Sequence, residues 1–229
     1  MAQPLVFTGF TPDTVRFLKD LKENNYKQWF EAHREVYENE LLRPFKALVA
    51  ALSPVMYNID SQFELRPHKA LSRIYRDIRF SKNKDPYKTC LWMNFQRTVT
   101  HWEFFPGFFM ELNAENYLYG MGLYLPRRAV MDNFRDLIEL EPENFGQMVQ
   151  KSVLERGFSI EGEAYKRPLP NNLPANLQAW VNRKSIYVMK ILPHNETLYS
   201  PALLQQIADD YTALKDLYLL MAEAADLSD

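Results

Sequence analysis

The chain has 229 residues, of which 47% are hydrophobic and 24% charged, with 27 Lys and Arg against 29 Asp and Glu. This is the composition of an ordinary globular protein, and the length suits one large domain or two small ones. The single cysteine excludes an internal disulfide and zinc sites built on paired cysteines, and the seven glycines form neither GxGxxG nor GxxxxGK[ST], which counts against phosphate-cradling loops.

No apolar run reaches the ~18 residues that a membrane span needs. The N-terminal segment has neither the basic start nor the apolar stretch of a signal peptide. We therefore expect a cytoplasmic protein without a membrane association.

The first part of the chain has the pattern of helices. Thr11 can cap a helix and Pro12 suits its first position, while Asn24 and Asn25 end the apolar periodicity. A second helical pattern follows as far as Ser53-Pro54, and Pro44 should kink or restart it.

The four histidines show no HxxxH or HExxH spacing, so a shared metal ion is not expected. His33 lies on the apolar stripe of the second helix. A core histidine is its simplest interpretation.

The middle of the chain predicts strands near 71–80, 89–96, 107–113 and 117–125, because short runs of Ile, Tyr, Phe and Trp alternate with turn residues. The polar tetrapeptide at 113–116 predicts a hairpin between the last two. Gly120 and Gly122 lie on one strand face and leave room for another element to approach.

The last third predicts helices at 127–140 and 142–152, a strand at 158–165, a short helix ending near Trp180, a strand at 185–192 and a long helix after Pro201. Apolar residues from Leu204 to Met221 step by three and four, as expected of an internal packing face or a dimer contact. The fold class expected is α+β. We expect one domain over 1–229, with a mostly antiparallel central sheet formed by about 62–125 and later strands, flanked by N-terminal helices and a long C-terminal helix.

Positive charge is concentrated in the stretch LSRIYRDIRFSKNKDPYKT, residues 71–89. Residues 66–88 carry a net charge of +6, whereas the rest of the chain carries −8. In a strand, Arg73, Tyr75, Asp77 and Arg79 would face one side, and Ile74, Arg76, Ile78 and Phe80 the core side. The turn that follows, which contains Ser81, brings three lysines to the end of that strand.

This stretch is the candidate binding site, since guanidinium and ammonium groups suit phosphate or carboxylate and tyrosines can stack on a base or sugar. The candidate ligand-binding residues are Arg73, Tyr75, Arg76, Asp77, Arg79, Lys82, Lys84, Tyr87 and Lys88. An anionic small molecule or a short nucleic acid is the expected partner. Alternatively, the chain's own acids, such as Glu103, Glu111 or those of the C-terminal helix, neutralise these cations.

Two further functions stay open. A phosphodiester or phosphate-ester hydrolase would need Asp77 to converge with Glu103 or Glu111 on a cation, and a protein-interaction module would dock an acidic partner on the basic stretch. Cys90 follows this stretch, where positive charge lowers a thiol pKa. No His-Cys-Asp pattern accompanies it, so a small buried thiol is expected.

The residues FLKDLKENNYKQWFEAHREVYENELLRPFKAL followed by SRIYRDIRFSKNKDPYKT resemble a bacterial and fungal family of conserved hypothetical proteins, domain of unknown function 2461. The resemblance is carried by an Asn pair before Trp-Phe and a later Tyr, by an Arg-x-x-x-Asp-x-Arg-Phe-Ser-Lys-x-Lys-x-Pro-Tyr-Lys run, and by GMGLYLP at 120–126. The matching residues of the first two motifs are Asn24, Asn25, Trp29, Phe30, Tyr37, Arg73, Asp77, Arg79, Phe80, Ser81, Lys82, Lys84, Pro86, Tyr87 and Lys88.

The segment KRPLPNNLP departs from a Pro-x-Gly turn of that family. The resemblance implies a single domain with no established activity, catalytic residue or cofactor. The leading hypothesis from the sequence is therefore a protein of unknown function that binds an anionic, phosphate-bearing ligand at residues 73–88.

Overall fold

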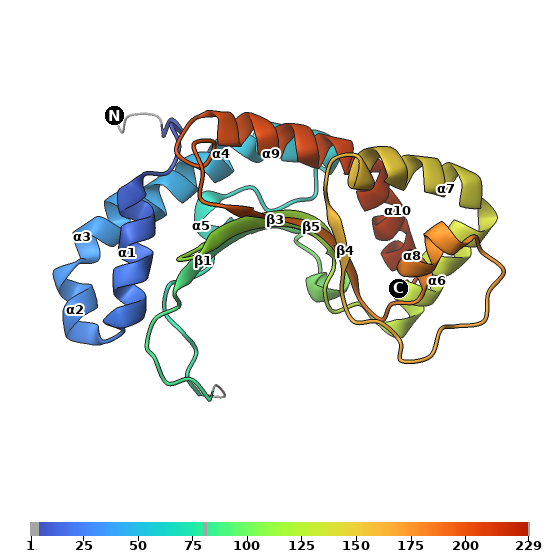
Figure 1. Cartoon of the computed structure of the whole chain (residues 1–229), viewed down its shortest axis with the longest axis horizontal. Coiled ribbons are helices and arrows are strands. Elements are labelled where there is room, and N and C mark those ends of the chain that lie inside the picture. The colour runs from blue at the N-terminus through green and yellow to red at the C-terminus, as the bar shows by residue number, and fades with distance from the viewer. Residues whose placement is uncertain (1–4, 80–81, 229) are drawn as a thin grey trace. The chain divides into compact units, whose positions relative to one another are not determined.

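The computed structural model describes residues 5–79 and 82–228; Phe80 and Ser81, expected on the core face and in the turn, lie outside the described residues. The fold class is α+β, as expected, with helices before and after a five-stranded sheet (Figure 1). Two compact units divide the chain. The first comprises the residues up to Phe95 with Phe109–Leu118 and Ile191–Ala208, and the second comprises Gln96–Phe108, Tyr119–Lys190 and the residues after Ala208. A single domain over the whole chain stays a prediction.

The predicted start of the first helix is confirmed. In α1 (Pro12–Glu23) the hydroxyl of Thr11 accepts a hydrogen bond from the Thr14 amide, and the Thr14 hydroxyl accepts one from the Thr11 amide. This reciprocal cap satisfies two amides that the first turn leaves without partners. Asn24 ends the helix.

The second helical pattern is divided into four pieces, α2 (Lys27–Ala32), α3 (Arg34–Val36), the π-helical turn η1 (Tyr37–Leu42) and α4 (Arg43–Ile59). Pro44 lies in the first turn of α4, directly after the π-helical turn η1, so it marks the point at which the helix changes type. The expected end at Ser53-Pro54 is wrong. The helix continues because Met56 and Ile59 are buried beyond it and the Ser53 hydroxyl bonds to the Val49 carbonyl at 2.8 Å.

The strand expected at 71–80 is wrong. The segment 71–89, here called the arm, follows α5 (Pro67–Ala70). Its described residues are mostly extended, and the bridges found among them are two isolated antiparallel ones, Leu71 with Met93 and Tyr75 with Tyr87. Figure 1 shows it, in teal, reaching past β1. The Arg76 amide donates to the Pro86 carbonyl at 2.9 Å, but proline has no N–H to return the bond, so the ladder ends there.

The other strands form one sheet in the order β1-β2-β3-β5-β4. Their bounds are Cys90–Phe95 for β1, Gly107–Asn113 for β2, Asn116–Leu123 for β3, Ser159–Glu161 for β4 and Ile186–Pro193 for β5. The predicted hairpin is confirmed, since the Asn113 side chain accepts bonds from the amides of Glu115 and Asn116 at 2.9 Å each. The strand expected at 158–165 shortens to the three residues of β4.

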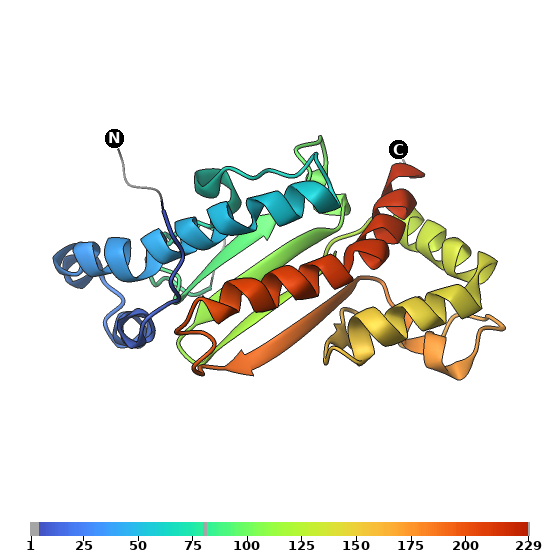
Figure 2. The ribbon, with the colours of Figure 1, turned by 90° about the horizontal axis from the view of Figure 1, so that it is seen from above.

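One face of β1 and β2 is buried and the other is half exposed, because side chains alternate along a strand. Leu91 and Met93 lie on the buried face with Met110 and Leu112, whereas Trp92 lies on the other, 37% exposed. Figure 2 shows α4 and residues 202–208 of α9 (Ala202–Ala213) side by side over the strands. The half-exposed face is therefore the one opposite these helices, on the side to which the arm extends in Figure 1.

Gly120 and Gly122 allow β3 to approach β5 closely, as the sequence predicts. A Cβ at Gly120 would overlap the Val188 carbonyl oxygen, and one at Gly122 would overlap the Cα of Tyr187. The register of these two central strands therefore depends on residues without side chains.

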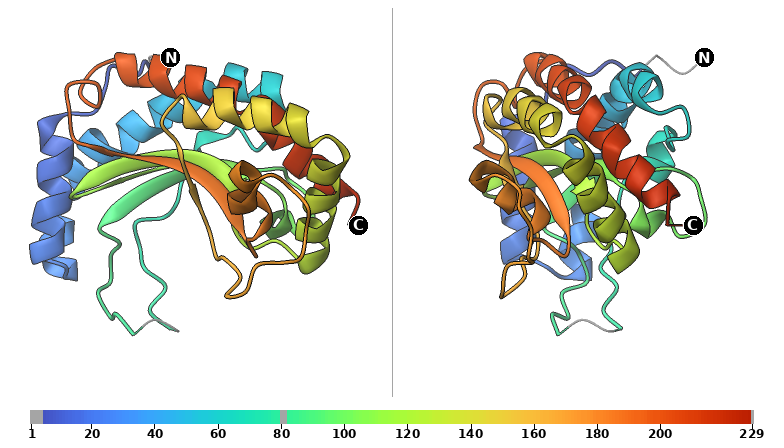
Figure 3. Two further views of the ribbon diagram at one scale, coloured as in Figure 1. Left: turned by 45° about the vertical axis from the view of Figure 1, so that its right-hand side comes forward. Right: turned by 90° about the vertical axis from the view of Figure 1, so that its right-hand side faces the viewer.

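In the second unit, helices α6 (Arg128–Leu140), α7 (Pro142–Val149) and η3 (Gln150–Leu154) follow β3. This unit also contains three shorter elements: the 3₁₀ turns η2 (Trp102–Phe104) and η4 (Ala175–Leu177) and the helix α8 (Gln178–Val181). The expected C-terminal helix bends at Leu214, where α9 gives way to α10 (Lys215–Asp226), which packs on α6 (Figure 3). Tyr211, Tyr218 and Met221 are fully buried, which confirms an internal packing face.

A buried carboxylate holds the second unit together. Asp210 accepts hydrogen bonds from the Tyr119 hydroxyl at 2.7 Å, from Lys190 at 2.6 Å and from Arg156 at 2.7 Å. Its side chain is 4% exposed, and a charge that is buried so deeply needs such partners. The sequence patterns gave no signal for this cluster. None of the helices in the described part of the chain has the length and apolar character that a membrane crossing requires.

We predict that Gly120→Ala lowers the free energy of unfolding by about 1–3 kcal/mol, because the new methyl group overlaps the β5 backbone. Gly146→Ala in α7 is the matched control, since a Cβ there would lie 3.7 Å from the nearest atom, an Asn176 side-chain nitrogen. It should leave stability unchanged or raise it, because alanine favours helix over glycine. Urea unfolding measures both, and equal midpoints for wild type and Gly120→Ala would contradict the prediction.

Candidate functional site

The arm is anchored at its root by a single side-chain amide. The Asn25 Oδ1 atom accepts the Tyr87 N–H at 3.0 Å, and the Asn25 Nδ2 atom donates to the Tyr87 carbonyl at 3.1 Å. The amide thus pairs with both backbone groups of Tyr87, as a neighbouring strand would. It ties the turn between α1 and α2 to the arm.

Aromatic rings pack beneath this anchor. The rings of Phe30 and Tyr87 stack with centroids 4.1 Å apart, and Tyr75 lies 5.5 Å from Tyr87. Tyr87 is only 2% exposed, so its expected role as a flat binding surface beside the lysines is wrong, because its ring serves as the root's core. Tyr75 is 50% exposed and its hydroxyl accepts a bond from Arg34 at 3.2 Å.

Two of the arm's cations are engaged by the arm itself. Arg79 binds Asp77 through two nitrogens, at 3.0 and 2.7 Å, and Lys84 donates to the Ile78 carbonyl at 2.9 Å. The Arg79 guanidinium lowers the pKa of Asp77 to about 2. Because this pKa is lowered on folding, the pair's contribution to stability is complete above the ordinary pKa and is lost as the pH falls toward 2. In an extended segment the Arg79 side chain was expected to reach the Asp77 carboxylate two positions away, and it does.

The remaining cations are available. Within residues 5–79 and 82–228, Arg73, Lys82 and Lys88 have no ion-pair partner. Lys88 lies 5.5 Å from the centre of the Trp92 ring, on the half-exposed sheet face. The cations of the arm therefore point to solvent and to this face of the sheet.

Arg76 occupies the root of the arm and is half buried. It donates through Nη2 to the Tyr87 carbonyl at 3.3 Å, but its buried Nε atom has no hydrogen-bond partner. An unpaired buried N–H is costly, so an acceptor that reached this atom would be bound favourably. Expected on the core face, Arg76 instead borders the half-exposed surface near Cys90.

The acids that were expected to neutralise the arm have other partners. Glu103 lies 3.5 Å from His101, and Asp226 of the C-terminal helix pairs with Arg97 at 3.0 Å. Glu111 accepts a bond from Asn113 at 3.2 Å. Among the described residues, the ion pair observed within the arm is that of Asp77 with Arg79.

The carboxylates do not form a metal centre. In the described ranges no group of three His, Cys, Asp or Glu side chains lies in an arrangement that could hold a metal ion. Asp77, Glu103 and Glu111 belong to no such group among the described residues. His33, expected in the core, is instead half exposed and stacks on Trp29.

Cys90 is not an activated nucleophile. Burial and the neighbouring Glu111 carboxylate raise the pKa of its thiol to about 12, and the nearby Lys88 and Arg76 charges only partly oppose this. The thiol is therefore neutral throughout the physiological pH range. The expected small buried thiol is in fact half buried, at the start of β1.

A family model described as "Conserved hypothetical protein (DUF2461)" matches residues 13–219. The chain belongs to this family. The DUF2461 match includes both motifs of the resemblance and extends through the KRPLPNNLP segment at which the sequence departs. No curated protein matches the chain.

In this DUF2461 protein the two motifs of the sequence meet in space. The Asn pair supplies Asn25, and the later run supplies Tyr87, its backbone partner. Sequence reasoning placed Asn25 at a helix end and missed this contact, because no periodicity reports a bond between residues 62 positions apart. The occurrence of Asn25 and Tyr87 in the two family motifs was the only sign of this contact in the sequence.

We predict that Asn25→Ala destabilises the protein by about 1–3 kcal/mol, because two backbone groups of Tyr87 lose their partners. The control is Asn24→Ala, which removes one exposed bond to the Asp20 carbonyl. Hydrogen exchange of the Tyr87 amide should accelerate in Asn25→Ala and stay at the wild-type rate in Asn24→Ala. Unchanged exchange in both variants would show that the amide pair does not hold the arm.

We predict that iodoacetamide alkylates Cys90 at pH 8 at least about a hundredfold more slowly than free cysteine, because the thiolate is scarce. Glu111→Gln should speed the reaction by removing the adjacent negative charge. Glu115→Gln is the control, since Glu115 lies on the same hairpin but pairs with Lys22 at 2.5 Å. Equal alkylation rates in wild type and Glu111→Gln would contradict this account.

Proposed function

We propose that this DUF2461 protein binds a phosphate-bearing anionic ligand along the arm. The cations that would contact it are Arg73, Arg76, Lys82 and Lys88. The observation that carries the proposal is that none of these four forms an ion pair with a described residue, although the chain as a whole is acidic. A cytoplasmic location belongs to the same proposal.

The arrangement of these cations favours an extended ligand. They lie along an exposed arm and continue at its root to Lys88 beside Trp92, so successive phosphates of one chain can meet successive cations. Trp92, 37% exposed, and Tyr75, 50% exposed, offer rings for stacking on bases. A short single-stranded nucleic acid uses both features, whereas a free phosphate compound uses only the charges.

No observation favours the two other hypotheses. A hydrolase has no group of converging carboxylates among the described residues. A protein-interaction module with an acidic partner would use the same cations. It differs from the proposed function because it would bind carboxylate-bearing ligands as well as phosphate-bearing ones.

The test is the binding of a labelled ten-nucleotide single strand, followed by fluorescence anisotropy at several salt concentrations. We expect the triple variant Arg73→Gln, Lys82→Gln, Lys88→Gln to bind at least about tenfold more weakly at ~0.1 M salt. Its plot of log K against log salt should be shallower by about 2, the slope that three phosphate contacts contribute for single strands.

The matched control is the triple variant Lys151→Gln, Lys166→Gln, Arg167→Gln, which removes the same charge from exposed positions of the second unit. It should bind as the wild type does. Equal losses in the two triple variants would reduce the effect to net charge and overturn the site, as would a wild type that does not bind the strand.

Competition identifies the source of the phosphate. Pyrophosphate and ATP should displace the strand only at concentrations well above that of an unlabelled strand. If ATP displaces it as effectively as the unlabelled strand does, a small phosphate compound is the ligand. Displacement by polyglutamate at equal charge would contradict phosphate recognition altogether.

A further inference from the structure

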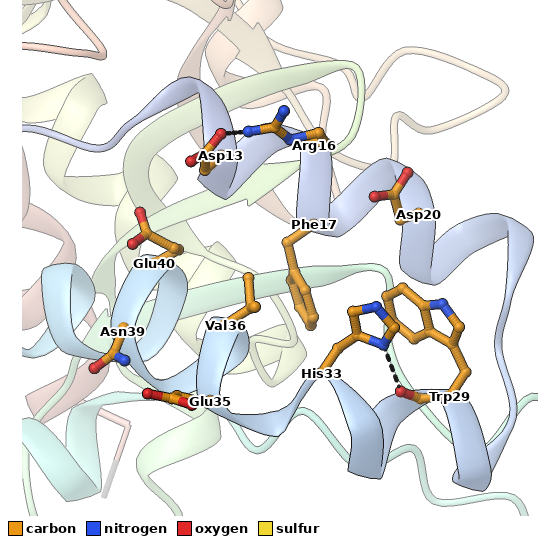
Figure 4. Close-up of a pocket in the computed structure, with 10 residues that line it drawn as sticks. All are labelled: Asp13, Arg16, Phe17, Asp20, Trp29, His33, Glu35, Val36, Asn39 and Glu40. Carbon is orange, nitrogen blue, oxygen red and sulfur yellow. Dashed lines mark hydrogen bonds and ion pairs between the residues drawn. The ribbon is translucent and has the colours of Figure 1, made fainter.

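Acidic side chains line a hollow in each unit, and the two hollows differ in their apolar surface. In the first unit, Figure 4 shows Asp20 and Glu35 at opposite edges, and the rings of Trp29 and His33 cover one another at 4.0 Å. The hollow of the second unit has a volume of about 390 Å³ and lies where α6, α7 and α10 pack together (Figure 3). Its apolar side chains are not covered by one another.

This second hollow is here called the groove. Its defining residues are Leu137, Leu140, Glu141 and Met148 of the α6–α7 segment and Asp216, Leu220 and Glu223 of α10.

The floor of the groove is apolar and open to solvent. Leu140 is 76% exposed, and Leu137, Met148 and Leu220 are half buried. Beneath them the buried ring of Phe145 meets Trp180 edge-on, with centroids 5.3 Å apart, which fixes the floor. Because burying a leucine side chain contributes about 1.5–3 kcal/mol, a partner that covered Leu140 would be bound favourably.

Negative charge surrounds this floor. Residues 136–149 contain four Asp or Glu and residues 216–226 contain three, and neither stretch contains Lys, Arg or His. The side chains of Asp216 and Glu223 form no hydrogen bond or ion pair with another described residue. The rim therefore attracts cations and repels a nucleic acid or an anionic membrane surface.

The arm of the same protein has the complementary properties. Its cations Arg73, Lys82 and Lys88 form no ion pair with a described residue. Ile78, which lies between them in the chain, is 41% exposed. Cations around an exposed aliphatic side chain match carboxylates around exposed leucines, and such complementary charge steers two surfaces together.

We propose that the groove receives the arm of a second copy of this chain. The cations of the arm pair with Glu141, Asp216 and Glu223, and Ile78 covers Leu140. Because two different surfaces meet, the copies join head to tail and form a ring or an open chain. The inference goes beyond phosphate binding but uses the same cations, so a bound strand and a second copy exclude each other.

The association is weak, because the contact is small and its charges are exposed. Interfaces of this kind belong to transient encounters, and exposed charges are screened by salt. We expect a dissociation constant of about 10–500 μM at low salt.

The experiment is sedimentation equilibrium of the wild type, whose monomer has a mass of 27.1 kDa. At ~20 mM salt the average mass should rise with protein concentration over ~10–300 μM, which distinguishes contact between copies from contact within one chain. At ~300 mM salt it should return to that of the monomer, because the range of the attraction shortens.

Removing the charge of the rim tests the groove. The triple variant Glu141→Gln, Asp216→Asn, Glu223→Gln should raise the dissociation constant at least about tenfold. The matched control is Glu35→Gln, Glu38→Gln, Glu196→Gln, which removes the same charge from exposed positions of the first unit and should associate as the wild type does.

The apolar floor has its own test, which leaves charge unchanged. Leu140→Ser should weaken association severalfold, because the leucine surface is no longer there to be covered. Leu125→Ser is the control, since Leu125 is 62% exposed in the same unit but does not line the groove. It should leave association unchanged.

Charge exchange tests the pairing of arm with groove directly. One variant carries Arg73→Glu, Lys82→Glu and Lys88→Glu, and the other carries Glu141→Lys, Asp216→Lys and Glu223→Lys. Each should stay monomeric alone, whereas their equimolar mixture should associate, because the acidic arm meets the basic groove and the basic arm meets the acidic groove. Circular dichroism checks that both fold, and the neutral variants above serve if either does not.

Several results would overturn the proposal: a wild type that stays monomeric throughout, equal losses in the two neutral triple variants, or folded charge-exchange variants that do not associate when mixed. A helical peptide of leucine and lysine that binds the groove of a monomeric wild type would assign it to a foreign basic segment and would also overturn it. Sedimentation uses the protein alone. A wild type that associates but binds no strand would therefore contradict the proposed function and leave this inference standing.

Discussion

The side-chain amide of Asn25 is the constraint on which the candidate site depends. By pairing with both backbone groups of Tyr87, it fixes where the arm leaves the body of the first unit. The stacked rings of Phe30 and Tyr87 exclude water from this junction, and hydrogen bonds are stronger in such surroundings. The junction thus sets where the part of the arm that carries most of the cations begins.

This anchoring explains how an acidic protein can keep positive charges unpaired. The root is held by an amide and by rings, so the arm does not need ion pairs to stay in place, and only Arg79 is bound by a described acid of the chain. In the second unit the opposite solution is found, since Asp210 gathers Lys190, Arg156 and Tyr119 around one buried carboxylate. Charge therefore serves cohesion around Asp210 and stays exposed along the arm.

Hydrogen bonds between residues close together in the chain could be predicted from the sequence, whereas contacts between distant residues could not. The cap at Thr11 and the hairpin at Asn113 depend on residues within a few positions, and both were predicted. The prediction of a strand at 71–80 was wrong. The residues alternate as in a strand, but the segment opposite them contains Pro86, which has no N–H to continue a ladder. The sites of Asn25 and Asp210 depend on partners far away in the chain, which periodicity cannot report.

Pro86 has a consequence for how tightly the arm can hold anything. Beyond it, the arm contains short-range bonds, such as those of Asp77 with Arg79 and of the Asn83 side chain with the Asp85 amide. A partner that settles on this stretch would have to restrict a backbone that no strand ladder restrains, and the lost conformational entropy weakens the complex. Such a surface is suited to brief, adaptable encounters with several related molecules more than to long residence of a single one.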